Sequence, residues 1–322
     1  MPASSFQAVF QQRRGHLTDP HVRALAWLLD APDLLDPMAD QWQGRIATLF
    51  DHQGPDIDAW LVELDHDPAA LHAFIDLYPF ARLGRYAERL MAFFFQHRGN
   101  LFAHGLQVRA GKNETIGEFD FLLWRGSALL HWEFATKFYL LESSAAGFDS
   151  DFLVGPSLDD TLGAKMRKIL DRQLSLSAHP AAKIHLPQAV DSAQALIKGW
   201  LFYHPDDRRP APPSGIAALG VSAGHCCGFW RTLAEAECLP DARYVILPRL
   251  RWLAPAQAAP DDCAGRAALL NALNAHFATD TLPVLVAEMH EQGQGGIAVE
   301  TERGFIVPND WRKRATEHVR RG

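Results

Sequence analysis

Apolar and polar positions alternate most regularly in the middle of the chain. We predict strands over residues 115–124 and 128–140, because both segments are rich in aromatic and branched side chains. Gly126 lies between them and suits a tight turn. The pattern therefore predicts a β-hairpin in which alternate side chains point to opposite faces.

One face of this hairpin is predicted to carry ionisable groups, and the other face is apolar. By alternation, the polar face contains Glu118, Asp120, His131, Glu133 and Lys137. Neighbouring carboxylates favour a bound cation, and hard oxygen ligands suit Mg²⁺ or Mn²⁺. The alternative interpretation is a solvated polar face, on which Glu133 and Lys137 form an exposed ion pair that contributes little stability.

Further elements are predicted on both sides of the hairpin. An amphipathic helix over 81–97 and a strand over 101–109 come before it. A helix over 158–176 and a strand over 195–203 come after it. The predicted order is one helix, three strands, one helix and one strand, which indicates an α/β fold.

This order, together with a short motif, resembles the PD-(D/E)xK nuclease superfamily. The motif is G-E-x-D at 117–120, followed by an apolar strand, a turn and a strand that carries Glu and Lys. More narrowly, the chain resembles an uncharacterised bacterial family placed in that superfamily. The resemblance implies a restriction-endonuclease-like α-β-β-β-α-β core. It also implies a metal-dependent hydrolase that cleaves phosphodiester bonds, with DNA as the first expected substrate and RNA as the alternative.

The resemblance also assigns roles to individual residues. Asp120 and Glu133 match the superfamily's metal-binding acids, and Lys137 matches its catalytic lysine. Glu88 matches an acid that supports the metal on the first helix, and Glu118 is a further candidate ligand. The implied cofactor is Mg²⁺ or Mn²⁺, which would activate water and neutralise the scissile phosphate.

One spacing departs from the superfamily pattern. Acid and lysine are usually two residues apart, whereas Glu133 and Lys137 are four apart, roughly 13 Å between Cα atoms in an extended strand. A β-bulge near Ala135 would shorten this gap. Without a bulge, the Lys137 side chain must reach back toward Glu133, or another base such as His131 takes the role of the lysine. The departure favours a second hypothesis, a catalytically silent protein of the same fold that binds nucleic acid or a protein partner.

Basic residues on the second predicted helix suggest a contact with nucleic acid. Lys165, Lys168 and Arg172 lie at i, i+3 and i+7, which places them on one helix face. Such a stripe beside carboxylates can hold a phosphate backbone. A solvated helix face is the alternative.

Composition and segment boundaries divide the 322 residues into three predicted regions. Residues 1–77 form a helical region and 78–205 the nuclease-like core, whereas 206–322 form an α+β extension that begins with a Pro-rich linker at 206–214. Helices are predicted over 20–29, 41–50, 57–64 and 68–77 in the first region. In the last region, strands are predicted over 216–221, 244–247 and 283–289, a hairpin over 293–307, and helices over 229–237 and 264–277.

Charge and cysteine content narrow the functional classes. The net charge is −7, and residues 1–77 hold 4 basic and 12 acidic residues, whereas 78–205 hold 14 and 12. This balance excludes a protein that coats nucleic acid through bulk charge, although a local basic groove remains compatible. Four cysteines without C-x-x-C spacing, no signal-like segment and no long apolar run predict a cytoplasmic protein without a membrane span.

Three other motifs offer alternatives. Gly220 to Gly224 fits G-x-S-x-G, so a serine hydrolase that uses Ser222 is a third functional hypothesis. His225 stands beside two cysteines, but adjacent cysteines rarely bind one zinc ion, and buried apolar cysteines are the expectation. The basic segment 311–321 is predicted to be a solvated terminal helix.

Overall fold

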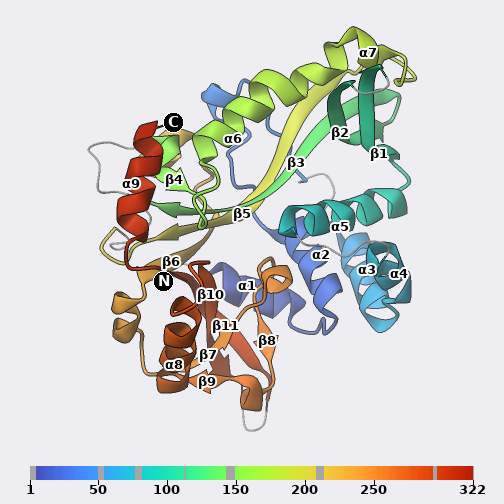
Figure 1. Cartoon of the computed structure of the whole chain (residues 1–322). Helices are drawn as coiled ribbons and strands as arrows, with labels where there is room; N and C mark the ends of the chain where they lie inside the picture. The colour runs from blue at the N-terminus through green and yellow to red at the C-terminus, as the bar shows by residue number, and fades with distance from the viewer. Residues whose placement is uncertain are drawn as a thin grey trace.

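The protein is a mixed α/β structure built on one large sheet (Figure 1). The computed structural model describes residues 5–49, 54–76, 82–111, 114–142, 149–207, 214–292 and 296–321. In these residues the main path of the sheet runs β1-β2-β3-β5-β6-β11-β10-β7-β9, while β4 pairs with β3 and β8 with β11. The pairs β3–β5, β5–β6 and β6–β11 are parallel, and the other pairings are antiparallel.

The strands, in chain order, are β1 (Leu101–Gly111), β2 (Glu114–Arg125), β3 (Ala128–Leu141), β4 (Leu153–Val154), β5 (Ser192–Tyr203), β6 (Cys226–Thr232), β7 (Arg243–Ile246), β8 (Gln257–Ala258), β9 (Ala264–Gly265), β10 (Val284–Glu291) and β11 (Ala298–Val307). The α-helices are α1 (Phe6–Arg14), α2 (Pro20–Asp30), α3 (Pro55–His66), α4 (Ala69–Asp76), α5 (Leu83–His97), α6 (Leu162–Lys168), α7 (Pro180–Lys183), α8 (Arg266–Phe277) and α9 (Trp311–Arg321). Within the described ranges, no helix has the length and apolar character needed to cross a membrane.

Local sequence signals explain where the helices begin. The Asp19 side chain accepts hydrogen bonds from the backbone N–H groups of His21 and Val22, and Pro20 occupies the first turn of α2. At the start of α6, the Thr161 hydroxyl accepts a hydrogen bond from the Ala164 backbone N–H. The elements predicted between 81 and 203 occur in the predicted order, although Ala81 lies outside the described residues.

Several predicted elements are wrong. Residues 41–49 are not helical beyond one 3₁₀ turn, Asp40–Trp42, because the chain then runs beside β5 and exchanges backbone hydrogen bonds with Ala195; Phe50 lies outside the described residues. Residues 214–219 form a 3₁₀ helix instead of a strand. A helix is predicted over 229–237, but residues 226–232 form β6, because their N–H and C=O groups pair with β5 and β11. Tertiary pairing therefore overrides local propensity at these positions.

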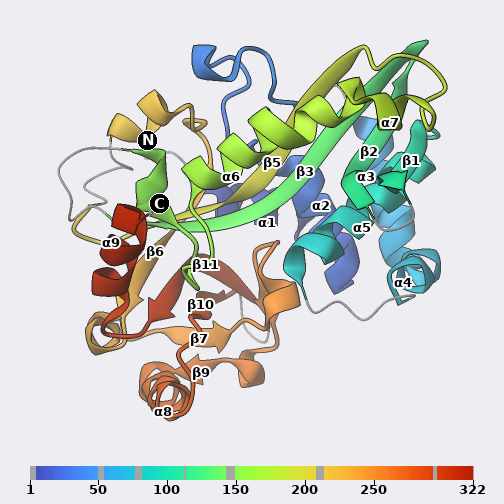
Figure 2. The same ribbon diagram turned by 45° about the horizontal axis from the view of Figure 1, so that its top comes forward.

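Both faces of the sheet are covered, and the two faces of β3 belong to different cores. Trp132, Phe134 and Phe138 pack with residues of α2 and α5. Ala135 and Tyr139, on the opposite face, pack with residues of α6. Figure 1 and Figure 2 show α6 along β3 and β5, with α2 and α5 on the other side. The hairpin face predicted to be polar therefore lies under a helix.

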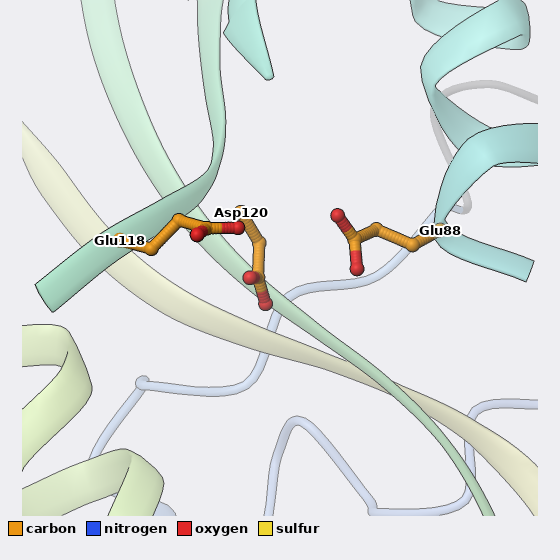
Figure 3. Close-up of side chains that lie close together, drawn as sticks. All are labelled: Glu88, Glu118 and Asp120. Atoms are coloured by element: carbon orange, nitrogen blue, oxygen red, sulfur yellow. The ribbon is translucent and has the colours of Figure 1, made fainter. Parts of the chain in front are cut away.

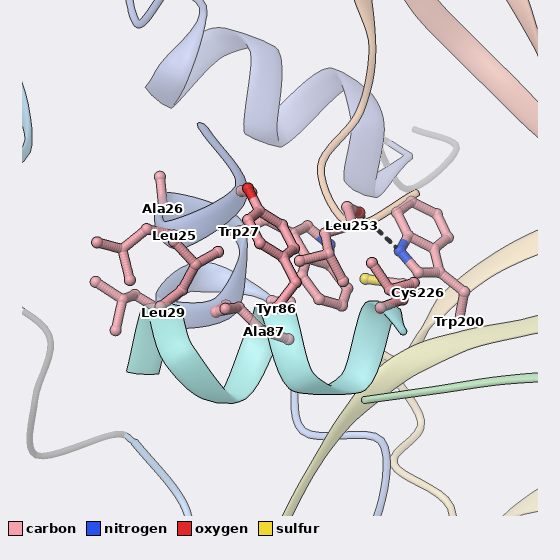
Figure 4. Close-up of a cluster of buried hydrophobic side chains, with 14 of the residues drawn as sticks. Leu25, Ala26, Trp27, Leu29, Tyr86, Ala87, Trp200, Cys226 and Leu253 are labelled. Atoms are coloured by element: carbon pink, nitrogen blue, oxygen red, sulfur yellow. Dashed lines mark hydrogen bonds between the residues drawn. The ribbon is translucent and has the colours of Figure 1, made fainter. Parts of the chain in front are cut away.

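Residues from all three predicted regions share one apolar core. Trp27 of α2 stacks on Trp200 of β5 with ring centroids 6.2 Å apart, and the Trp200 indole N–H donates to the Leu253 carbonyl oxygen at 3.0 Å (Figure 4). Strands of the C-terminal region continue the sheet of the central region through β6. The region boundaries at 77/78 and 205/206 stay predictions, and residues 208–213 of the predicted linker lie outside the described residues.

The C-terminal helix α9 is docked, so the prediction of a solvated terminal helix is wrong. Trp311 is buried, its ring centroid lies 5.0 Å from that of Trp230, and its indole N–H donates to the Pro156 carbonyl oxygen at 2.7 Å.

We expect Trp311→Ala to lower the free energy of unfolding by about 3 kcal/mol or more, because a large cavity is left. Chemical denaturation measures this. The exposed neighbour Lys313→Ala serves as control, and equal stability of the two variants would contradict the docking.

Candidate metal centre

The candidate site lies where β2 separates from β3. The two strands pair only from Phe121 opposite Trp132 to the turn, whereas β3 continues beside β5 (Figure 1). At the point of separation, the Asp120 carboxylate accepts a hydrogen bond of 2.9 Å from the Phe134 backbone N–H. The side chain thus accepts a hydrogen bond from a backbone N–H group that does not pair with β2, and this contact fixes the position of Asp120.

Three carboxylates converge where β2 separates from β3, and we call this group the acidic fork. Glu88 comes from α5, and Glu118 and Asp120 come from β2; one oxygen of each lies within 4.8 Å of the others (Figure 3). The Glu88 and Glu118 side chains are 14% and 27% exposed. The structure therefore brings together three of the four acids predicted from the sequence as metal ligands.

Neighbouring side chains orient two of these carboxylates. His104 Nε2 lies 2.8 Å from Glu88 Oε1. Arg85 Nη1 lies 3.8 Å from Glu118 Oε1, and the Gln107 amide donates to Glu118 Oε2 at 3.4 Å. Outer contacts of this kind hold ligand side chains in a metal-binding orientation. These three neighbours lie on β1 and α5 and belong to no motif, so nothing in the sequence singles them out.

Glu133 lies behind Asp120, inside the protein. Its side chain is 1% exposed, so the interpretation of a solvated polar face is wrong for this residue. His131 Nε2 lies 2.9 Å from Glu133 Oε1, and the Gln173 amide donates to Glu133 Oε2. Each oxygen keeps a second lone pair, so a role in metal binding stays a prediction.

Burial raises the pKa values of this acid pair. The pKa of Asp120 rises to about 7 because the carboxyl is desolvated and because Glu133 is close. Burial likewise raises the pKa of Glu133 to about 7, against the attraction of Lys165. Burial lowers the pKa of His131 to about 4, so this imidazole is neutral at neutral pH. The pair therefore holds a proton readily at neutral pH when no cation is bound.

Lys137 makes a different contact from the one the resemblance implies. Its ammonium group lies 2.5 Å from Asp160 Oδ2, and the side chain is 24% exposed. The pairing of β3 with β5 is regular from Leu130 to Leu140, so no bulge at Ala135 shortens the distance to Glu133. A catalytic role for Lys137 stays a prediction.

The predicted basic stripe is divided by the local structure. Lys165 is half-buried, whereas Lys168 and Arg172 are exposed. The predicted helix 158–176 consists of α6, a π-helical turn (Ile169–Gln173, η4) and a 3₁₀ turn (Leu174–Ala178, η5). The change of pitch after Lys168 moves Arg172 away from the helix face that Lys165 and Lys168 share in α6. It also places Gln173, a residue to which the sequence assigned no role, against Glu133.

The G-x-S-x-G motif lacks the surroundings of a nucleophile elbow, and the prediction of buried cysteines is confirmed only in part. Ser222 precedes strand β6 and follows a 3₁₀ helix, which is not the strand–turn–helix context of a nucleophile elbow. His225 contacts the Ser222 carbonyl oxygen at 2.6 Å and the Tyr203 hydroxyl at 2.7 Å. Cys226 and Cys263 are buried as expected, but Cys227 is half-buried and Cys238 is exposed.

The donor set at the fork fits a hard divalent cation. It consists of carboxylate oxygens, which Mg²⁺ and Mn²⁺ prefer. Opposite ligands at about 2.1 Å from an ion are about 4.2 Å apart, only slightly less than the 4.8 Å limit on the spread of the three oxygens. Small side-chain rotations would complete such a site, with water in the remaining positions.

The protein is therefore a mixed α/β protein with a carboxylate-rich candidate metal centre. Residues 23–307 match the family described as "Domain of unknown function (DUF1853)", and the chain belongs to this family. No curated protein matches the chain. No solved structure matches it either.

Proposed function

We propose that the protein is a metal-dependent nuclease that hydrolyses phosphodiester bonds, with DNA as its substrate. The observation that carries the proposal is the convergence of Glu88, Glu118 and Asp120 beside the buried Glu133. The order α5-β1-β2-β3-α6-β5, with β3 parallel to β5, supports a restriction-endonuclease-like core.

In this proposal, Glu88, Glu118 and Asp120 hold Mg²⁺ or Mn²⁺, and Glu133 supports Asp120. The ion supplies Lewis acidity, which lowers the pKa of water and neutralises phosphate charge. Asp120 and Glu133 lose their protons when a cation is bound beside this desolvated acid pair, so binding releases protons. His131 and Gln173 keep the Glu133 carboxylate in place.

Nucleic acid reaches the site through a local contact, since the chain as a whole is acidic. Lys168 and Arg172 are exposed on the segment that follows the start of α6, and we assign them to phosphate contacts away from the cut bond. Because few cations contribute, the dependence of binding on salt is expected to be shallow.

Isothermal titration calorimetry with Mn²⁺ and Mg²⁺ tests the metal site. Saturable binding is expected in the wild type, and Glu118→Gln and Glu88→Gln should each weaken it by about 10-fold or more, because each removes a charged ligand. Glu114→Gln, an exposed position on the same strand, is the control. The same proteins are incubated with linear, circular and single-stranded DNA. A wild type that binds neither ion would refute the proposal.

A second candidate function is supported by the contact of Lys137 with Asp160. If no other cation acts on the phosphate, the protein is a catalytically silent relative that binds nucleic acid or a protein partner. Metal binding without cleavage of any of the three DNA forms is the result that favours this candidate.

A further inference from the structure

The acidic fork has a second lysine beside it, which comes from α6. Lys165 is half-buried, and its ammonium group lies 3.5 Å from the Gln173 side-chain oxygen. The amide nitrogen of the same Gln173 donates to Glu133. A chain of polar contacts therefore links Lys165, through one neutral amide, to the buried acid.

Electrostatics place Lys165 near both members of the acid pair. Its positive charge opposes the burial that raises the pKa values of Asp120 and Glu133. Burial and the nearby Lys137 lower the pKa of Lys165 itself, while the two acids raise it. Lys165 is thus a partly desolvated cation that interacts with the two acids and with two other lysines, Lys137 and Lys168.

The local fold explains why Lys165 lies beside Gln173. Leu162, Met166 and Ile169 are buried against the β3 and β5 face that carries Ala135. With these apolar positions fixed, Lys165 lies at the border of the buried stripe. The start of α6 is further fixed by Asp151, which accepts hydrogen bonds from the Thr161 hydroxyl and the Ala164 backbone N–H.

The π-helical turn completes this arrangement. It begins at Ile169, directly after α6, and ends at Gln173. The next turn, η5, packs on the sheet through the buried Leu174 and Leu176, and Leu176 lies against Gly117 of β2. Single π turns are frequent at functional sites, where they redirect a side chain. Here the turn aims Gln173 back at Glu133 and Lys165.

We propose that Lys165 is the catalytic lysine of this site, which contacts the scissile phosphate, and that Gln173 is the residue that positions it. This inference rests on the nuclease function proposed above. The two lysines differ in their partners: Lys137 is neutralised by a carboxylate at 2.5 Å, whereas Lys165 has a neutral amide oxygen at 3.5 Å. A phosphate oxygen can therefore replace a weak contact of Lys165 without breaking an ion pair.

The proposed role is charge stabilisation during hydrolysis. The oxygen of a water molecule forms a bond to phosphorus, and the bond from phosphorus to one ester oxygen breaks. The proton of the water passes through solvent to the leaving oxygen, which becomes a hydroxyl group. Negative charge grows on the non-bridging oxygens in between, and the Lys165 ammonium donates a hydrogen bond to one of them.

Lys165→Met tests this role, because it removes the charge and keeps the apolar stem. Single-turnover cleavage of linear DNA at saturating Mn²⁺ is expected to slow by about 100-fold. Calorimetry at about pH 8.5, where the acids are ionised, is expected to show Mn²⁺ binding roughly fivefold tighter, because a repelling cation is gone. A merely structural lysine would not produce tighter binding together with slower cleavage.

The controls separate this inference from the function on which it rests. Lys183→Met, at an exposed lysine of α7, should change neither quantity, and Lys165→Arg should restore the wild-type Mn²⁺ affinity. Lys165→Met that cleaves within about threefold of the wild type, or that binds Mn²⁺ more weakly, overturns the inference and leaves the nuclease proposal intact. A wild type that does not bind Mn²⁺ overturns both.

Discussion

Replacing Asp120 with asparagine is expected to abolish saturable Mn²⁺ binding and to stabilise the metal-free protein at pH 8. The substitution removes a charged oxygen from the candidate metal centre, while the asparagine side-chain oxygen can still accept the hydrogen bond from Phe134. Loss of function and gain of stability in one variant is the pattern expected of a functional site whose groups oppose folding.

The sign of the stability change follows from the direction of the pKa shift. The pKa of Asp120 rises from its ordinary value near 4 in the unfolded chain to about 7 in the folded protein. Between these two values the folded protein binds more protons, so the free energy of unfolding falls as pH rises through this range. Above about pH 7 the full penalty is present. The asparagine side chain cannot ionise, and we expect the variant to be more stable at pH 8 by about 2 kcal/mol.

Urea denaturation of the metal-free wild type and of Asp120→Asn, at a series of pH values from 5 to 8.5, measures this difference. The two curves should lie closest at pH 5 and separate further as pH rises to about 7. Glu114→Gln, an exposed change on the same strand, is the control and should follow the wild type at every pH. Parallel curves for the wild type and Asp120→Asn would show that Asp120 is not a buried ionisable group in the folded protein.

The largest loss of stability is expected from Arg303→Met. Arg303 is fully buried on β11, where its guanidinium makes two ionic contacts with Glu300 at 2.6 and 2.7 Å. It also donates to the carbonyl oxygens of Trp252 and Ala254, and it lies 4.2 Å from the Trp200 ring centroid. Removing it leaves the Glu300 carboxylate buried without its cation, which costs about 3–5 kcal/mol.

Thermal and urea unfolding of Arg303→Met measure this loss, and Arg314→Met is the matched control. Arg314 makes an exposed ion pair with Asp310 at 3.8 Å, so its replacement should change stability by less than about 1 kcal/mol. The double variant Arg303→Met, Glu300→Gln should recover part of the loss, because no unpaired charge remains. A double variant less stable than Arg303→Met would contradict this account.

The local elements of the central region could be predicted from the amino-acid sequence. The alternation of apolar residues in 115–140 and the 3.6-residue period in 81–97 depend only on neighbours along the chain, and the structure has strands and a helix there. The separation of the β3 faces followed from the same alternation, with Trp132 and Phe134 on one side and Glu133 on the other. Periodicity is a local property, so it can be read without knowledge of tertiary contacts.

Tertiary packing was needed to show which of these residues meet and how deeply they are buried. Glu88 joins Glu118 and Asp120 because α5 packs across the sheet, and no spacing in the sequence specifies that packing. The coverage of β3 by α6 makes Glu133 a buried acid, and the π turn places Gln173 in contact with both Glu133 and Lys165 of α6. Long-range pairing also turned 226–232 into a strand of the large sheet. Burial, desolvation and charge proximity arise from contacts between distant segments, and for this reason the raised pKa values of Asp120 and Glu133 could not be predicted from the sequence alone.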